Sequence, residues 1–88
     1  MPSQSVTIVN QKGLHARAAT TFVKLASGFE SAVKVTRDAT SANGKQIMML
    51  LILAAPLGST ITIETTGADA DQALAALVEL VQSGFGET

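Results

Sequence analysis

The chain has 88 residues, of which 47% are hydrophobic, 15% are charged and 3% are aromatic, and its formal net charge is −1. This length suits one small domain over residues 1–88, with a modest core and no room for a deep substrate cleft. The absence of cysteine excludes thiol chemistry and disulfides, and the slight negative charge with few aromatic side chains disfavours nucleic-acid binding. No signal peptide and no apolar run long enough for membrane insertion is evident, so we expect a cytoplasmic protein.

The first half of the chain predicts a strand, a helix and a hairpin. Apolar and polar residues alternate over 5–9, which is typical of a half-buried strand. Apolar residues then recur every three or four positions over 15–27, which predicts an amphipathic helix that Gly28 is placed to end. Alternation over 32–37, with a short strand near 40–42, predicts the hairpin.

The second half predicts a helix, a strand and a last helix. Good helix formers fill 45–54, and alternation over 60–65 indicates a strand. Asp69 can cap the next helix while Gln72 reaches back to it, a variant of the capping box, and Gly84 is placed to end that helix.

This order, β-α-β-β-α-β-α, predicts an α+β open-faced sandwich. A four-stranded antiparallel sheet would be covered on one face by three helices, because their apolar faces must pack against each other. The other sheet face would be solvated. The polar residues expected on that face are Thr7, Lys34, Thr36, Thr62 and Glu64.

The stretch 10–19 places the only histidine, His15, after a glycine turn and at the start of the predicted helix. Unpaired backbone amides at a helix start, here those of Ala16 and Arg17, attract anions. A neutral imidazole has a lone pair that can attack phosphorus, and the Arg17 guanidinium offers a fork of donors to phosphate oxygens. The stretch therefore predicts a phosphoryl acceptor at His15, stabilised by Arg17.

Other chemistry has less support in the sequence. A single histidine near a helix start is more often an ordinary surface residue, so His15 could also be inert. A serine hydrolase is disfavoured, because there is no G-x-S-x-G motif and no matched acidic residue near His15. The lone histidine also has no neighbouring ligands for a metal, so we expect no metal and no cofactor.

The motif Gly13-Leu14-His15-Ala16-Arg17, after a strand and before an amphipathic helix, resembles the active-site signature of HPr, the histidine-containing phosphocarrier family of the bacterial phosphotransferase system. Residues 43–48 and 67–70 are similar to that family's second-helix start and last strand-to-helix turn. The resemblance implies that enzyme I phosphorylates His15 on Nδ1 at the expense of phosphoenolpyruvate, and that the group passes to an enzyme IIA domain. Such a chain is a stoichiometric carrier and not an enzyme, and we expect a monomer.

A surface around the two helix starts is expected to dock these partners. Basic residues gather there while most acidic residues lie beyond residue 60, so an acidic partner would be attracted. The helix at 45–54 is too apolar for one buried stripe, so part of it can stay exposed with Met48 outward. The candidate docking residues are Thr20, Lys24, Lys45, Ile47, Met48 and Leu51.

The sequence departs from the family pattern at two positions. Ala18 replaces the usual proline, which removes a φ restraint from the first helical turn. Gln46 replaces the serine that regulatory kinases modify in many relatives, so no regulatory serine is predicted there. The tail over 75–87 is similar to the nitrogen-related NPr branch, which leaves open an alternative function as a regulatory binding module that responds to its phosphorylation state.

Overall fold

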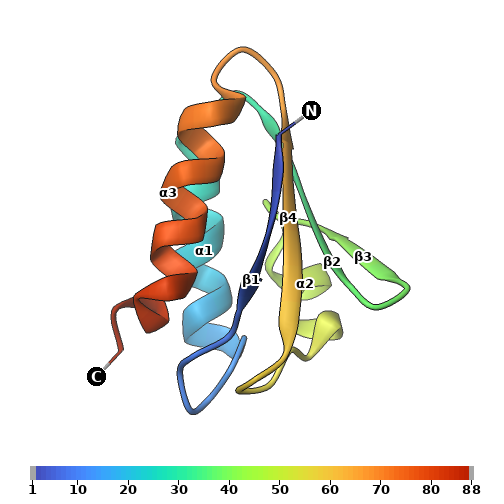
Figure 1. The fold of residues 1–88 in the computed structure, drawn as a ribbon, viewed down its shortest axis with the longest axis vertical. Helices are drawn as coiled ribbons and strands as arrows, with labels where there is room; N and C mark the ends of the chain where they lie inside the picture. Colours follow the sequence, from blue (N-terminus) through green and yellow to red (C-terminus); the bar gives the residue numbers. More distant parts are fainter. Residues whose placement is uncertain (1, 88) are drawn as a thin grey trace.

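The structure is a computed structural model that describes residues 2–87, within which there are four strands, three α-helices and a final 3-10 turn (Figure 1). In chain order they are β1 (Ser3–Thr7), α1 (Ala16–Ser27), β2 (Ala32–Arg37), β3 (Thr40–Asn43), α2 (Ile47–Leu53), β4 (Thr60–Thr66), α3 (Ala70–Gln82) and the turn η1 (Gly84–Gly86). The predicted element order is confirmed.

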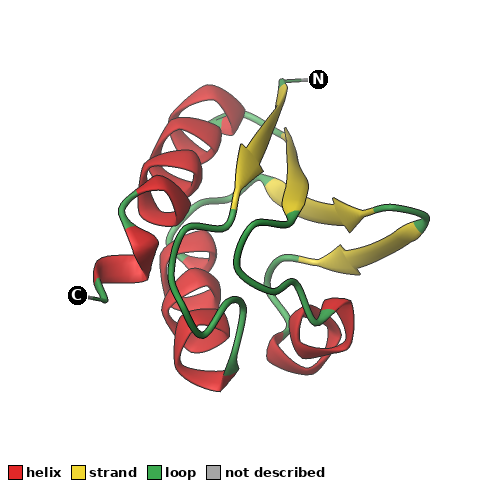
Figure 2. Cartoon of the chain, turned by 60° about the horizontal axis from the view of Figure 1, so that its bottom comes forward, coloured by secondary structure: helices red, strands yellow, loops and turns green. Residues whose placement is uncertain are grey.

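The strands form one antiparallel sheet in the order β1-β4-β2-β3. The central strand β4 pairs with β1 from Ser3↔Glu64 to Thr7↔Thr60, and with β2 from Ala32↔Thr66 to Thr36↔Thr62. Figures 1 and 2 show α1 and α3 side by side along one face of this sheet. With α2 packed against β3 and α1, the predicted open-faced sandwich is confirmed.

The core lies between the sheet and the helices. The periodicity of apolar residues in the sequence explains which side chains are buried in it. Val33 and Val35 of β2 are buried while Lys34 between them is exposed, because successive strand residues point to opposite faces. Burying each such large apolar side chain contributes about 1.5–3 kcal/mol. The largest fully buried apolar side chains are Phe22, Ile8, Leu50, Ile61, Ile63, Leu77, Val35 and Val81.

The uncovered sheet face is polar, as predicted. Thr7 and Lys34 are exposed, and Thr36, Thr62 and Glu64 are half-buried. Hydroxyl pairs cross the strands on this face, with 3.1 Å between Ser5 Oγ and Thr62 Oγ1. Within residues 2–87 no helix combines the length and the apolar character needed to cross a membrane.

Three predicted boundaries, both ends of β1 and the start of α2, are wrong by two residues. β1 covers Ser3–Thr7 and not 5–9, because the chain leaves the ladder where β4 begins, and the Ile8 amide instead donates to the Ser59 carbonyl at 2.8 Å. α2 begins at Ile47 and not at residue 45, since Asn43 Oδ1 accepts the Lys45 amide at 2.9 Å and holds that segment as a turn.

The predicted capping box at Asp69 is also wrong. The Asp69 carboxylate makes no bond to its own helix and accepts instead from the Glu30 amide at 2.9 Å and from the Ser31 amide and hydroxyl at 2.9 and 2.5 Å. The Ser31 hydroxyl, followed by the Glu30 amide, holds the pKa of Asp69 below its usual range. This carboxylate therefore ties the β4–α3 turn to the α1–β2 loop.

Candidate functional site

The loop before α1 is tightly held, which determines where His15 lies. The Gly13 amide donates to the Asn10 carbonyl at 3.1 Å, and Gly13 has a φ of +64°, a conformation that glycine adopts without strain. The Leu14 amide donates to the Ala55 carbonyl at 2.8 Å, and the Leu14 side chain is buried. These contacts fix the loop against the segment after α2 and present His15 at the start of α1.

His15 is the N-cap residue of α1, with an extended backbone and a ring that is 26% exposed. The amides of Ala16 and Arg17 follow directly and have no acceptor inside the helix, so they make the ring's surroundings favourable for an anion. The Arg17 side chain is exposed, and within residues 2–87 it forms no ion pair. The structure thus brings the three predicted residues together at one end of α1.

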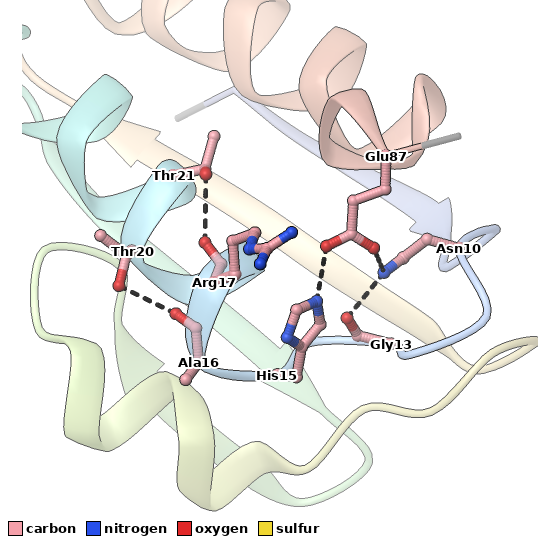
Figure 3. Close-up of polar contacts among 8 residues, drawn as sticks. All are labelled: Asn10, Gly13, His15, Ala16, Arg17, Thr20, Thr21 and Glu87. Carbon is pink, nitrogen blue, oxygen red and sulfur yellow. Dashed lines mark hydrogen bonds and ion pairs between the residues drawn. The ribbon is translucent and has the colours of Figure 1, made fainter.

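A fourth residue, which is not predicted from the sequence, completes the site. Glu87 Oε2 lies 2.5 Å from His15 Nε2, and Asn10 Nδ2 donates to Glu87 Oε1 at 2.9 Å (Figure 3). Asn10 Nδ2 also donates to the Gly13 carbonyl at 2.8 Å. The expectation that no acidic residue accompanies His15 is wrong, because the fold joins residues 72 positions apart.

The contact with Glu87 decides which ring nitrogen is free. The hydrogen bond from His15, then that from Asn10, keeps the pKa of Glu87 below its usual range, and the charge of Lys12 adds to this, so the group is ionised at neutral pH. An ionised carboxylate can only accept, which assigns the proton of a neutral His15 ring to Nε2. Figure 3 shows the other ring nitrogen, Nδ1, turned away from Glu87. With the proton on Nε2, this nitrogen carries the ring's lone pair.

The tail after α3 delivers Glu87 to this position. α3 ends at Gln82, and Gly84, Phe85 and Gly86 then have φ values of 71°, 58° and 75°. Phe85 is only 5% exposed and belongs to the core, so it anchors the turn. The sequence predicts Gly84 as a helix end, and the pattern Gly84-Phe85-Gly86 is the local signal that the tail folds back.

The predicted separation of basic and acidic residues fails at this point. Glu87 belongs to the acidic second half of the chain, yet the fold places it against His15. It also lies close enough to Lys12 for that positive charge to add to the effect of the His15 hydrogen bond in lowering the pKa of Glu87. The distribution of charge along the sequence therefore does not describe the surface around the site.

The candidate docking residues lie in different surroundings. Lys24 is exposed near the end of α1, and Thr20 Oγ1 donates to the Ala16 carbonyl at 2.8 Å. Lys45 is half-buried and its Nζ donates to the Phe29 carbonyl at 2.7 Å, so it is not a freely solvated cation. The predicted electrostatic attraction of an acidic partner therefore suits Lys24, which is exposed, better than Lys45.

The helix α2 leaves a set of apolar side chains exposed. Leu50 and Leu53 are buried and Leu51 is half-buried against the core, whereas Met48 is 70% exposed, which confirms its outward position. Gln46 is the exposed N-cap of the same helix. We call the exposed set the α2 apolar patch, and it consists of Ile47, Met48, Met49 and Ile52.

Comparison with known proteins gives a consistent result over nearly the whole chain. Residues 2–83 match the family described as PTS HPr component phosphorylation site. The chain is 48% identical to the phosphocarrier protein HPr of Neisseria meningitidis serogroup A, covering 99% of this chain and 98% of that protein. It is 39% identical to the phosphocarrier protein NPr of Escherichia coli K12, covering 96% and 94% of the two chains.

The fold comparison agrees with the sequence comparison. The crystal structure of HPr from Thermoanaerobacter tengcongensis matches with a TM-score of 0.96 and 39% identity, covering 100% of this chain and 99% of that one. An α+β sandwich with this topology, a histidine at the N-cap of its first helix and full-length similarity to HPr and NPr lead to one assignment. The chain belongs to the HPr family of phosphocarrier proteins.

Proposed function

We propose that His15 accepts a phosphoryl group from enzyme I and passes it to an enzyme IIA domain. The observation that carries this proposal is the position of the only histidine, whose Nδ1 is turned away from Glu87 at the start of α1. The guanidinium of Arg17, which forms no ion pair within residues 2–87, belongs to the same end of the helix. Relatives named as phosphocarriers support it at 39–48% identity. The protein acts as a cytoplasmic monomer, a single domain that is loaded by one protein and unloaded by another.

The geometry suits the chemistry of phosphoryl transfer. Nδ1 attacks phosphorus in line with the donor, and the three equatorial oxygens carry negative charge that needs positioned donors. Arg17 and the first amides of α1 supply such donors at the surface. Because the reaction needs positioning and charge stabilisation more than covalent chemistry, a shallow site is sufficient.

Incubation with enzyme I and phosphoenolpyruvate tests the proposal. Intact mass spectrometry is expected to show one acid-labile phosphoryl group on the wild-type chain and none on His15→Ala. Thermal unfolding of His15→Ala serves as the folding control. An unmodified wild-type chain, or a His15→Ala chain that is still phosphorylated, contradicts the proposal.

The role of Arg17 has its own test. Arg17→Ala is expected to slow phosphorylation about tenfold or more, because it removes a charged fork of donors from the transferring group. Its unfolding temperature should stay close to that of the wild type, since the side chain is exposed and has no ion pair within residues 2–87. Arg17→Lys keeps the charge without the fork and should be intermediate. Equal loss of rate and stability in Arg17→Ala counts against a phosphate role.

Control by a serine kinase at the start of α2 is not part of this function. The N-cap of α2 is Gln46, whose amide cannot accept a phosphoryl group in place of a hydroxyl. We therefore expect no regulation by phosphorylation at that position.

A further inference from the structure

Glu87 engages both of its carboxylate oxygens at the site. Oε2 contacts His15 Nε2 at 2.5 Å and Oε1 accepts from Asn10 Nδ2 at 2.9 Å, while the side chain is only 20% exposed. The residue lies outside the segment 2–83 that matches the family description. Its contacts therefore form a defined arrangement that the family match does not cover.

The Asn10 side chain is held in place where it binds Glu87. Its side chain is 6% exposed, and its amide nitrogen donates both to the Gly13 carbonyl and to Glu87. Its Oδ1 is buried and, among the residues that the structure describes, has no hydrogen-bond partner. An unpaired buried carbonyl is unfavourable, so what this side chain contributes is its pair of amide hydrogens.

The backbone of the tail leaves Glu87 little freedom. Phe85 adopts a φ of 58°, which is unfavourable for a residue with a side chain, between two glycines that accept such values readily. Burial of the Phe85 ring in the core holds this conformation. A strained segment with a buried anchor places the carboxylate before any partner arrives.

We propose that Glu87 is a positioning residue for phosphoryl transfer, which orients the His15 ring with its proton on Nε2 and stabilises the positive charge that the ring gains when Nδ1 attacks phosphorus. This inference rests on the proposed function. The Nδ1 lone pair forms the N–P bond while the bond between phosphorus and the donor breaks. The electron pair of the broken bond stays with the donor. The Nε2 proton stays in place, and unloading reverses these steps towards the acceptor.

The position of Glu87 separates its charge from the incoming group. The carboxylate contacts Nε2, whereas the attacking lone pair is on Nδ1, which is turned away from it (Figure 3). Within residues 2–87 Glu87 forms its ion pair with His15 and not with Arg17, so the guanidinium stays available for phosphate oxygens. The opposite effect, repulsion of the phosphoryl group by Glu87, predicts a faster reaction when the charge is removed.

Glu87→Gln removes the charge with little change in shape, and Glu79→Gln is the matched control on the exposed side of α3. Rates are measured with two donors, phosphoramidate and enzyme I with phosphoenolpyruvate. With both donors Glu87→Gln is expected to react about tenfold more slowly than the wild type, and Glu79→Gln at the wild-type rate. The small donor reports the reactivity of the ring without protein docking.

Nitrogen-15 NMR of the ring gives a readout that a merely structural role would not change. Since His15 is the only histidine, its signals identify the tautomer directly. The wild type is expected to show the Nε2–H form alone when the ring is neutral, and Glu87→Gln and Glu87→Ala a mixture of both forms. Thermal unfolding of the three variants checks that the fold is retained.

Each result has a definite meaning. An unchanged or faster reaction of Glu87→Gln with phosphoramidate overturns the inference, as does a loss confined to enzyme I or an unchanged tautomer. A wild-type chain that reacts with phosphoramidate but not with enzyme I contradicts the proposed function, while the Glu87 comparison with phosphoramidate still decides this inference.

Discussion

Gly13 is the residue on which the geometry of the site depends most directly. A Cβ at this position would lie 2.4 Å from the Ala55 carbonyl oxygen and 2.9 Å from Pro56 Cα, and its φ of +64° disfavours any side chain. Both contacts involve backbone, which cannot move aside as a flexible side chain can. His15 follows two residues later, so a shift of Gly13 moves the proposed phosphoryl acceptor.

Gly13→Ala is expected to lower the free energy of unfolding by about 2 kcal/mol or more, because left-handed strain and a backbone clash act together. It should also slow phosphorylation of the molecules that remain folded. Gly58→Ala is the matched control, since Gly58 has a φ of +88° but a Cβ there would meet nothing within 4 Å. Urea denaturation and phosphorylation rates of both variants give the comparison, and equal effects contradict the clash.

The residues of the site differ in how visible they are in the sequence. His15, Ala16 and Arg17 are adjacent, so a local motif identifies them. Glu87 is 72 positions from His15 and depends on the Gly-Phe-Gly turn. The Gly-Phe-Gly pattern indicates that the tail turns back, but it does not tell which residue Glu87 contacts, because that pairing depends on the whole fold.

Among the elements, predictability follows the strength of the local pattern. The bounds of β2 and of the end of α1 agree with the prediction, because apolar periodicity and a glycine mark them. The start of α2 and the capping of α3 do not agree, since Asn43 and Asp69 hydrogen-bond to other backbone groups instead. When a polar side chain has several possible hydrogen-bond partners, tertiary contacts determine which of them it binds.

The Asp69 contact predicts a pH-dependent stability. The carboxylate accepts three hydrogen bonds from Glu30 and Ser31, and its pKa is lowered mainly by the Ser31 hydroxyl. A group with a lowered pKa in the folded state stabilises the fold above its unfolded pKa, and that contribution is lost as the pH falls through the folded value. Asp69→Asn should therefore be less stable than the wild type at pH 7, with a difference that shrinks below pH about 4.

Thermal unfolding from pH 2 to pH 7 measures this difference. Asp71→Asn is the control, because Asp71 is an exposed acid in the first turn of α3 and loses the same charge. A difference between Asp69→Asn and the wild type that is constant with pH, or an equal effect of Asp71→Asn, argues against the hydrogen-bonded carboxylate as the cause.

At the scale of the whole molecule, the α2 apolar patch and the His15 site lie on helices that contact each other. Met48 and Ile52 are 70% and 71% exposed, which is unusual for large apolar side chains on a small protein surface. Methionine adapts to differently shaped partners, so this patch suits a protein that must dock on more than one. We expect it to form the apolar centre of the docking surface.

Met48→Glu should raise the KM for phosphorylation by enzyme I about tenfold, because a charge would be buried in the apolar part of the complex. The kcat and the unfolding temperature should change little, since the side chain is solvated in the free protein. Steady-state kinetics with varied carrier concentration measure this, and the rate with phosphoramidate is the control. An effect on kcat alone, or on the phosphoramidate rate, contradicts a docking role.

The His15 ring lies near the surface at one end of α1, and this position affects how partners can bind in the proposed phosphoryl relay. With His15 as the proposed phosphoryl acceptor, a partner that covers this end of α1 would block access for another, so we expect donor and acceptor proteins to bind in alternation and not to form a ternary complex. An excess of either partner without cargo to exchange then acts as a competitive inhibitor of the other. In the proposed relay we therefore expect the ratio of the three proteins to influence the flux of phosphoryl groups.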